Sequence, residues 1–407
     1  MWLTGATVVD GTGSDPVPGQ NVHIENGRIV ALGGAPPPGA EVVDLTGLVL
    51  TPGLIDAHVH LGLSSDLGRA GTFELSAAEL AADMFANCRQ TLESGFTTVR
   101  DTGGVDRGIA DVVAGGKVPG PRILHCGPLL AQTGGHGYLG AAWEDPAAWS
   151  SHHLPGLAAQ SLVCDGPDEV RKSAREAFRR GAGFLKMCVT GGVVSHYDDL
   201  TDTQFGHDEI AAAVAEAAAR STYVTVHAHN NRGLRTAVEA GATCVEHGTG
   251  IDEEMAALMA ARGVAHVPTL SVCHALLADA TEAGLPAHIG ERVGDALEGQ
   301  RRAILAGRAA GVLIGSGSDL IGPRQEHRGN ELVLRSKIET PMRALVSATR
   351  DNARVLRIDD EVGTVEPGRI ADLTVFSADP LADPSAFDDP ERIPLVVQAG
   401  RIVKDRR

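Results

Sequence analysis

Short apolar runs alternate with longer amphipathic segments through the middle of this chain. Runs of this length are typical of buried β-strands, and they occupy eight stretches, at 55–60, 96–101, 122–127, 183–189, 223–228, 243–247, 264–268 and 312–316. The segments between them are rich in Ala, Glu and Arg and predict helices, for example over 76–94, 168–181, 208–220, 231–240, 252–262 and 291–310. Strand–helix alternation of this kind predicts the α/β class and a closed parallel (β/α)8 barrel, the TIM barrel.

Residues with known preferences for helix ends support these bounds. Ser76 and Asp252 are expected N-caps, because a hydroxyl or carboxylate oxygen accepts from the free N–H groups of the first turn. Glycines follow four of the predicted helices, and glycine readily adopts the left-handed conformation of a C-terminal cap. They are Gly95, Gly241, Gly263 and Gly311.

Both ends of the chain instead contain short strands and tight turns. Near the N-terminus the strand-like stretches are 6–9, 21–24, 28–31 and 48–50, and Asn26-Gly27 predicts a type I′ hairpin turn. The C-terminal stretches 368–376 and 395–403 mirror them, again with a glycine-containing turn at Ala399-Gly400. We therefore predict a small β-sandwich domain built from residues 1–52 and 362–407, with the barrel inserted as residues 53–361.

Composition narrows the class of protein. The 407 residues are 43% hydrophobic and carry a formal net charge of −17, which argues against nucleic-acid phosphates and anionic membranes as partners. No run of 18 apolar residues and no basic stretch followed by an apolar core is present, so neither a membrane span nor a signal peptide is expected. Six cysteines without a CxxC pair predict buried free thiols in a reducing compartment, hence a cytoplasmic protein.

Polar side chains gather at the ends of the predicted strands. His58 and His60 alternate on one strand and therefore point to the same side, which makes half of a metal site; the alternative is a solvated turn. In a barrel, the carboxyl ends of all strands meet at one mouth. The other side chains expected there are Lys186, His227, His229, His247 and Asp319. Imidazole and carboxylate are ligands for zinc and similar metals.

Lys186 looks misplaced in such a group, because an ammonium repels a dication. Its segment, Phe184-Leu-Lys-Met-Cys-Val189, predicts a buried position rather than the alternative of a surface lysine. A deprotonated amine can add CO₂ to give a carbamate, whose two oxygens can bridge two metal ions. We therefore predict that Lys186 is carboxylated.

Several motifs together give the chain a recognisable pattern. They are Pro52-Gly-Leu-Ile-Asp-Ala-His-Val-His60, Thr98-Val-Arg-Asp-Thr-Gly-Gly104, Gln132-Thr-Gly-Gly-His-Gly137, Lys186 with Gly191-Gly192, His227-Ala-His229, Glu246-His-Gly-Thr249, Val267-Pro-Thr-Leu270, Ser318-Asp319 and Glu366-Pro-Gly-Arg-Ile-Ala-Asp-Leu373. In this combination the sequence resembles the metal-dependent amidohydrolase superfamily over nearly its whole length. Within the superfamily it is most similar to the imidazolonepropionase-like branch with zinc prolidases and ochratoxinase-type carboxypeptidases.

The resemblance implies a centre of two divalent metal ions, expected to be zinc. His58 and His60 would hold one ion together with Asp319, and His227 and His247 would hold the other. Carboxylated Lys186 would bridge both ions with a hydroxide between them. Relatives are commonly oligomeric, so a homo-oligomer is compatible with the resemblance.

The expected reaction is hydrolysis of a C–N amide bond in a peptide-like or N-acyl amino acid substrate. Two zinc ions would lower the pKa of a shared water and polarise the carbonyl. Asp319 would take the proton and pass it to the leaving nitrogen, because an amide anion is a very poor leaving group.

The substrate is expected to meet residues around the mouth. His136 in a glycine-rich loop is a candidate contact for its carbonyl or carboxylate, although an ordinary loop histidine is the alternative. His229 and Tyr197 are further candidate contacts. Arg324 or Arg328 could pair with a substrate carboxylate, the alternative being a solvated side chain. The long stretch 138–165 is a candidate lid.

Three alternatives stay open. A specialised biosynthetic amidohydrolase could trim a modified peptide natural-product precursor, with stretch 138–165 as the place of specialisation. A cyclic-amide or imidazolone-type ring hydrolase, or a deaminase, could use the same fold, but such sites generally lack the lysine that stands here as Lys186. A barrel that lost its metals would be a non-enzymatic scaffold, although every expected ligand is retained.

Overall fold

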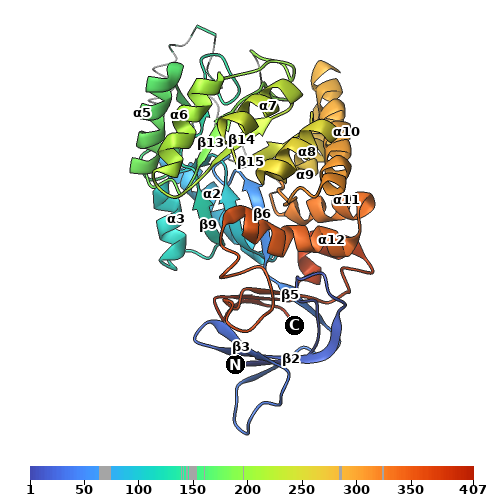
Figure 1. Ribbon diagram of the computed structural model, residues 1–407. Helices are drawn as coiled ribbons and strands as arrows, with labels where there is room; N and C mark the ends of the chain where they lie inside the picture. Colours follow the sequence, from blue (N-terminus) through green and yellow to red (C-terminus); the bar gives the residue numbers. More distant parts are fainter. Residues whose placement is uncertain are drawn as a thin grey trace.

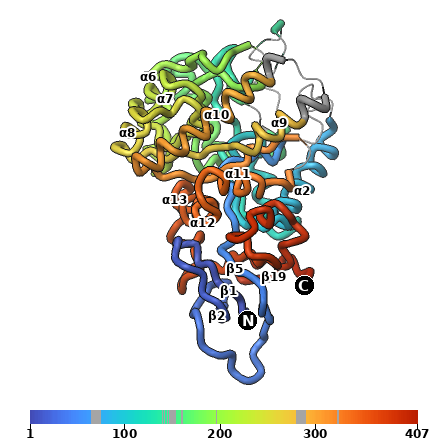
Figure 2. The backbone as a smooth tube through the Cα atoms, turned by 90° about the vertical axis from the view of Figure 1, so that its right-hand side faces the viewer, coloured from blue at the N-terminus to red at the C-terminus, as the bar shows by residue number. Residues whose placement is uncertain are grey.

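The chain forms a larger α/β part that carries a smaller, sheet-rich part at one end (Figure 1). This computed structural model describes residues 1–63, 75–138, 140, 142–143, 145, 154–159, 161–195, 197–283, 287–322 and 325–407. Both chain ends lie in the smaller part, and a view turned by 90° places them there again (Figure 2). The architecture is TIM-barrel-like with a second domain, because parallel strands in the larger part are covered on their outside by helices.

Among the described residues of the larger part, the parallel strands form two sheets. One has the order β6-β7-β9, with bounds Leu54–Val59, Phe96–Asp101 and Arg122–His125. The other has the order β12-β10-β13-β14-β15-β16. Its strands are β12 (Leu162–Val163), β10 (Leu130–Ala131), β13 (Leu185–Cys188), β14 (Val224–Ala228), β15 (Cys244–His247) and β16 (Ala265–Val267). Neither sheet closes on itself, so the closed barrel stays a prediction.

The eighth predicted strand, 312–316, is not a regular strand. It makes a single parallel bridge between Ile314 and His266. The side-chain amide of Asn352 donates to the carbonyls of Ile55 (2.6 Å) and Ser316 (2.8 Å) and accepts from the N–H of Ser316 (2.9 Å). The Asn352 side chain therefore makes some of the backbone hydrogen bonds that a neighbouring strand would otherwise make here.

Helices cover the outside of the parallel strands (Figure 1). They are α2 (Ala77–Glu93), α3 (Arg107–Ala114), α5 (Gly166–Arg179), α6 (His207–Ala218), α7 (Asn231–Ala240), α8 (Glu253–Arg262), α9 (Leu270–Ala283), α10 (Ala287–Ala310), α11 (Asn330–Ile338), α12 (Pro341–Val346) and α13 (Asn352–Leu356). The N-caps Ser76 and Asp252 are confirmed, since their side chains accept from the N–H groups of Glu79 (3.2 Å) and Met255 (2.8 Å). In the part of the chain that is described, no helix is long and apolar enough to cross a membrane.

The smaller part is one sheet made from both ends of the chain. Its strand order is β19-β18-β17-β5-β1-β2-β3, with β4 paired to β1. The strands are β1 (Trp2–Val8), β2 (Val17–Glu25), β3 (Arg28–Leu32), β4 (Val42–Asp44), β5 (Val49–Pro52), β17 (Leu373–Phe376), β18 (Leu395–Gln398) and β19 (Arg401–Asp405). Asn26 (φ 50°) and Gly27 (φ 77°) confirm the predicted hairpin turn. The predicted boundaries at 52/53 and 361/362 stay predictions.

Candidate metal centre

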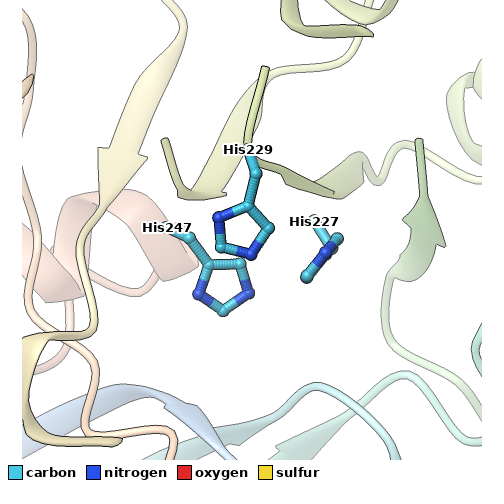
Figure 3. A group of neighbouring side chains, drawn as sticks. All are labelled: His227, His229 and His247. Atoms are coloured by element: carbon cyan, nitrogen blue, oxygen red, sulfur yellow. The ribbon is translucent and has the colours of Figure 1, made fainter. Parts of the chain in front are cut away.

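Histidine side chains from neighbouring strand ends meet within the larger part. His227 and His229 come from β14 and its end, and His247 ends β15; ligand atoms of all three lie within 4.8 Å of one another. Figure 3 shows the three rings gathered in one place, with His229 and His247 side by side. A second group, His58, His247 and Asp319, satisfies the same distance, so His247 belongs to both. This is the pattern expected when parallel strands deliver ligands to one edge.

The rings of His58 and His60 are oriented by the protein. Nδ1 of His58 lies 2.8 Å from Oε2 of Glu246, and Nδ1 of His60 lies 2.8 Å from the carbonyl of Gly103. The opposite nitrogens turn toward Asp319: Nε2 lies 3.4 Å from Oδ1 for His58 and 3.2 Å for His60. Burial alone would raise the pKa of Asp319, but the two imidazoles outweigh it and hold that pKa well below its usual range. Asp319 is therefore an ionised carboxylate at neutral pH.

His227 and His247 are held in the same manner. Nδ1 of His247 lies 2.7 Å from the hydroxyl of Thr269, and Nε2 of His227 lies 3.2 Å from the carbonyl of Gly191. Burial, helped by the neighbouring imidazoles, lowers the pKa values of both side chains well below the usual range. They are therefore neutral at neutral pH, which is the form that binds a metal ion.

Two residues of this group have a strained backbone. His247 has φ 64° and Asp319 has φ 54°, the left-handed region that non-glycine residues seldom adopt. The N–H of Asp319 donates to the carbonyl of His58 at 2.8 Å, which ties the two candidate ligands together. Strain of this kind persists where the surroundings enforce it, and it clusters at functional sites.

Lys186 lies in the middle of β13 and is only 3% exposed. The alternative of a surface lysine is therefore wrong. Lys186 pairs with Thr225 of the neighbouring strand β14, two positions before His227. Its charge adds to burial in lowering the pKa values of His136, His227 and His247. Its position fits the amine that a carbamate bridge would require.

A buried ion pair that the sequence pattern does not predict lies behind His58. Glu246 and Arg100 are both 0% exposed, and Nη2 of Arg100 donates to Oε1 of Glu246 at 2.6 Å. Glu246 also accepts from the hydroxyl of Thr225. The signal available in the sequence was a charged residue inside each of two apolar strands, Glu246 in β15 and Arg100 in β7. Carboxylates in this position orient metal-binding histidines and raise their basicity.

His136 and His229 flank the candidate ligands. The ring of His136 stacks on that of His227 with centroids 4.1 Å apart, and its Nδ1 lies 2.6 Å from the hydroxyl of Ser195. Nδ1 of His229 lies 2.8 Å from the hydroxyl of Thr249. Burial lowers the pKa of His136 to about 4 and that of His229 to about 3. Both rings are therefore neutral hydrogen-bonding groups at the centre.

The other predicted substrate contacts lie differently. Tyr197 is 45% exposed, and its hydroxyl donates to the carbonyl of Gly140 at 3.0 Å. Arg324 lies outside the described residues, and so do parts of the candidate lid, including 146–153. Both interpretations of Arg328 are wrong, because this side chain is fully buried and bonds to Ser318 and Gln325 instead of to solvent.

The donor set fits divalent metal ions of the zinc type. Imidazole nitrogens and carboxylate oxygens are ligands that such ions prefer. For each of the four histidines on which the prediction rests, one ring nitrogen contacts a protein hydrogen-bonding atom, so the opposite nitrogen is the one left for a metal: His58, His60, His227 and His247.

Comparison with known proteins gives a consistent picture. Residues 49–403 match the profile of the "Amidohydrolase family". Ochratoxinase of Aspergillus niger is 31% identical over 372 residues, covering 88% of this chain and 76% of the relative. A crystal structure of a prolidase complexed with N-methylphosphonate-L-proline is 34% identical, with TM-score 0.93 and 99% of both chains covered. A Xaa-Pro dipeptidase with bound methionine is 28% identical, with TM-score 0.88 and 99% of both chains covered.

Proposed function

This chain belongs to the amidohydrolase family, and we propose that it is a binuclear, zinc-dependent enzyme for peptide-like or N-acyl amino acid substrates. Its family and its prolidase and ochratoxinase relatives make it a hydrolase that acts on amide bonds. The observation that carries the finer proposal is the buried Lys186 among neutral imidazoles. A buried ammonium there is costly, whereas a carbamate adds ligand oxygens.

In this proposal each metal ion has its own ligand set. His58, His60 and Asp319 hold one ion, which the convergence of both Nε2 atoms on Asp319 supports. His227 and His247 hold the other, which the neutral state of both rings supports. Lys186, if carboxylated, would add carbamate oxygens as further ligands for both ions.

The chemistry divides between the ions and the side chains. When bound, two divalent ions lower the pKa of a shared water and polarise the amide carbonyl. Asp319 would accept a proton from the attacking water, whose oxygen bonds to the carbonyl carbon, and return it to the leaving nitrogen as the C–N bond breaks. His136 and His229 are neutral, so each can donate one hydrogen bond to a carbonyl or carboxylate oxygen of the substrate.

We further infer that the parallel strands close into an eight-stranded barrel. Backbone bonds at the seam support closure: the N–H of Gly315 donates to His266 (2.8 Å), and the N–H of Ala57 donates to Ser316 (3.0 Å). On the other side, the N–H of Gly183 donates to the carbonyl of His125 at 2.9 Å. A cytoplasmic location and a homo-oligomer stay predictions.

The test combines metal analysis with a substrate screen. Protein supplied with zinc and bicarbonate should hold two metal ions per chain and release a free amino acid from a member of an Xaa-Pro or N-acyl amino acid library. His58→Ala should lower both the metal content and the turnover. His23→Ala is the control, because His23 stacks on Trp2 in the second domain. Unchanged metal content and turnover in His58→Ala would refute the proposal.

A further inference from the structure

A buried polar cluster adjoins the candidate ligands along the chain. Its members are Asp56, Ser318, Gln325 and Arg328, which we call the arginine clamp, and each is at most 2% exposed. Asp56 precedes His58 by two positions on β6, and Ser318 immediately precedes Asp319. Side chains this polar are seldom fully buried unless they bond to one another.

Asp56 joins the two chain segments that carry His58 and Asp319. Its Oδ1 accepts from the N–H of His58 at 3.1 Å and from the N–H of Ser318 at 3.0 Å. Its Oδ2 accepts from the hydroxyl of Ser318 at 2.5 Å. One carboxylate therefore fixes the backbone of two segments next to their candidate ligands.

Arg328 connects this carboxylate to the loop that follows Asp319. Nη1 donates to the hydroxyl of Ser318 at 3.0 Å and lies 3.5 Å from Oδ2 of Asp56. Nη2 donates to Oε1 of Gln325 at 2.8 Å. Because a guanidinium presents its donors in a rigid fork, it fixes several partners at once.

The clamp also reaches α2 and the loop after β6. Nε of Arg328 donates to the hydroxyl of Thr91 on α2 at 2.9 Å. Nε2 of Gln325 donates to the carbonyl of Leu63 at 2.8 Å, three residues beyond His60. The loops that carry His60 and Asp319 are therefore held against each other by one buried side chain and its partners.

We propose that Arg328 is a positioning residue that preorganises the metal site formed by His58, His60 and Asp319. The inference rests on the proposed function. The left-handed backbone of Asp319 is costly, so the native conformation persists only where neighbours over-determine it. The clamp supplies that restraint from the residue before Asp319 and from the loop after it. Arg328 touches no substrate in this role and acts through Ser318, Asp56 and Gln325.

The test measures metal affinity in the full chain, with separate titrations for the two ions. Arg328→Met should weaken zinc binding at the site formed by His58, His60 and Asp319 by roughly 10–100-fold. This is the range for loss of a residue that holds a metal ligand in place. The site with His227 and His247 should change less, because no member of the clamp bonds to those rings. Arg328→Lys keeps the charge without the fork and should recover only part of the affinity.

A largely buried arginine in another ion pair provides the control. Arg180 is paired with Asp106 at 2.8 Å, with side chains 9% and 7% exposed. Arg180→Met should lower the melting temperature of the metal-free protein and leave both zinc affinities unchanged. If Arg328→Met fails to fold, Gln325→Met removes the bonds to Leu63 and to Arg328 while Arg328 keeps its counterion Asp56, and it should still weaken the same site.

The outcomes separate the two proposals. If the unaltered protein takes up no zinc, the proposed function fails before any variant is compared. If it binds two ions and both clamp variants bind them with affinities within twofold of the unaltered protein, the positioning role of Arg328 is wrong while the proposed function stands. Weakening confined to the site with Asp319 supports the clamp.

Discussion

Glu246 shows how much a single buried carboxylate can govern at this centre. It orients His58 and at the same time neutralises Arg100, which is fully buried and donates its Nε hydrogen to the carbonyl of Ala57 at 2.6 Å. The carboxylate thus connects the interior of the strands with a candidate ligand. Burial would raise the pKa of Glu246, but Arg100 and His58 hold it well below the usual range, so the side chain stays ionised.

Replacing Glu246 should therefore affect both stability and metal binding. Glu246→Gln leaves the charge of Arg100 buried without a counterion, which costs about 3–5 kcal/mol in comparable cases. It should also reduce metal affinity by roughly 10–100-fold. Urea denaturation of the metal-free protein measures the first effect and chelator competition measures the second. A free energy of unfolding equal to that of the unaltered protein would contradict the assigned ion pair.

Gly192 controls the position of His136. A Cβ atom at Gly192 would collide with the imidazole of His136, so alanine should displace the ring from its stack on His227. Gly192→Ala should lower kcat/KM by at least about tenfold, or about 1.4 kcal/mol, while metal content stays unchanged. Gly294→Ala on α10 is the control, since nothing lies within 4 Å of the added atom. If kcat/KM is the same in both variants, His136 is not a substrate contact.

At the residue scale, the sequence predicts the location of those side chains that stand at the carboxyl end of a strand. His58, His227 and Asp319 could be predicted in this way, because parallel strands bring their carboxyl ends to one edge. Arg328 could not, since a charged residue in a polar loop is usually solvated. Its partner Asp56 is 272 positions away along the chain, and only tertiary packing brings them together.

At the scale of elements, α11 is joined to the start of α9 by a buried acid. Oε2 of Glu331 accepts from the N–H of Ser271 at 2.8 Å. Burial raises the pKa of Glu331 to about 8, so the carboxyl is protonated in the folded protein at neutral pH. In the unfolded chain the pKa of the same group is near its ordinary value of 4.5. Burial of this carboxyl therefore favours the folded state most when the solution is acidic enough to keep the group neutral in the unfolded chain as well.

A pH dependence of stability follows. The raised folded pKa means that the contribution of Glu331 is fully present below about pH 4.5 and is lost as the pH rises through about 8. Glu331→Gln, which cannot ionise, should therefore become more stable relative to the unaltered protein between pH 5 and about pH 8. Urea denaturation of both proteins across this range measures the difference. A difference that does not change with pH would contradict the raised pKa.

The elements differ in how well their pattern predicts them. Long helices with capping residues and strands with apolar runs were predicted to within a few residues, as for α2 and β7. The stretch 312–316 has the composition of a strand, but the side chain of Asn352 bonds to its backbone in place of part of the ladder. The short helices α11 to α13 lack a repeated apolar spacing that would distinguish them from loops.

At the scale of the whole molecule, the candidate centre joins distant parts of the chain. Its side chains come from β6, β13, β14, β15 and the segment after 312–316. Any ion bound there favours the folded state over the unfolded chain, in which these ligands are separated.

Removal of metal should therefore destabilise the protein. At a free metal concentration about 100 times the Kd, one bound ion contributes roughly 2.7 kcal/mol. Chelation should lower the melting temperature by several degrees and abolish turnover, and zinc should restore both. Scanning calorimetry with and without chelator measures the change. His58→Ala should show a smaller shift, and an equal shift in both proteins would assign the metal effect to another site.

The sheet shared by the two chain ends has a consequence for synthesis. β5 lies between β1 and β17, so one of its edges is completed only by strands that begin at Leu373. Unpaired strand edges attract other chains. While the ribosome is still building the α/β part, the nascent chain therefore carries an unpaired strand edge. The C-terminal strands must pair with this edge before another chain does. Translation that stalls before Leu373 should leave a product that chaperones retain.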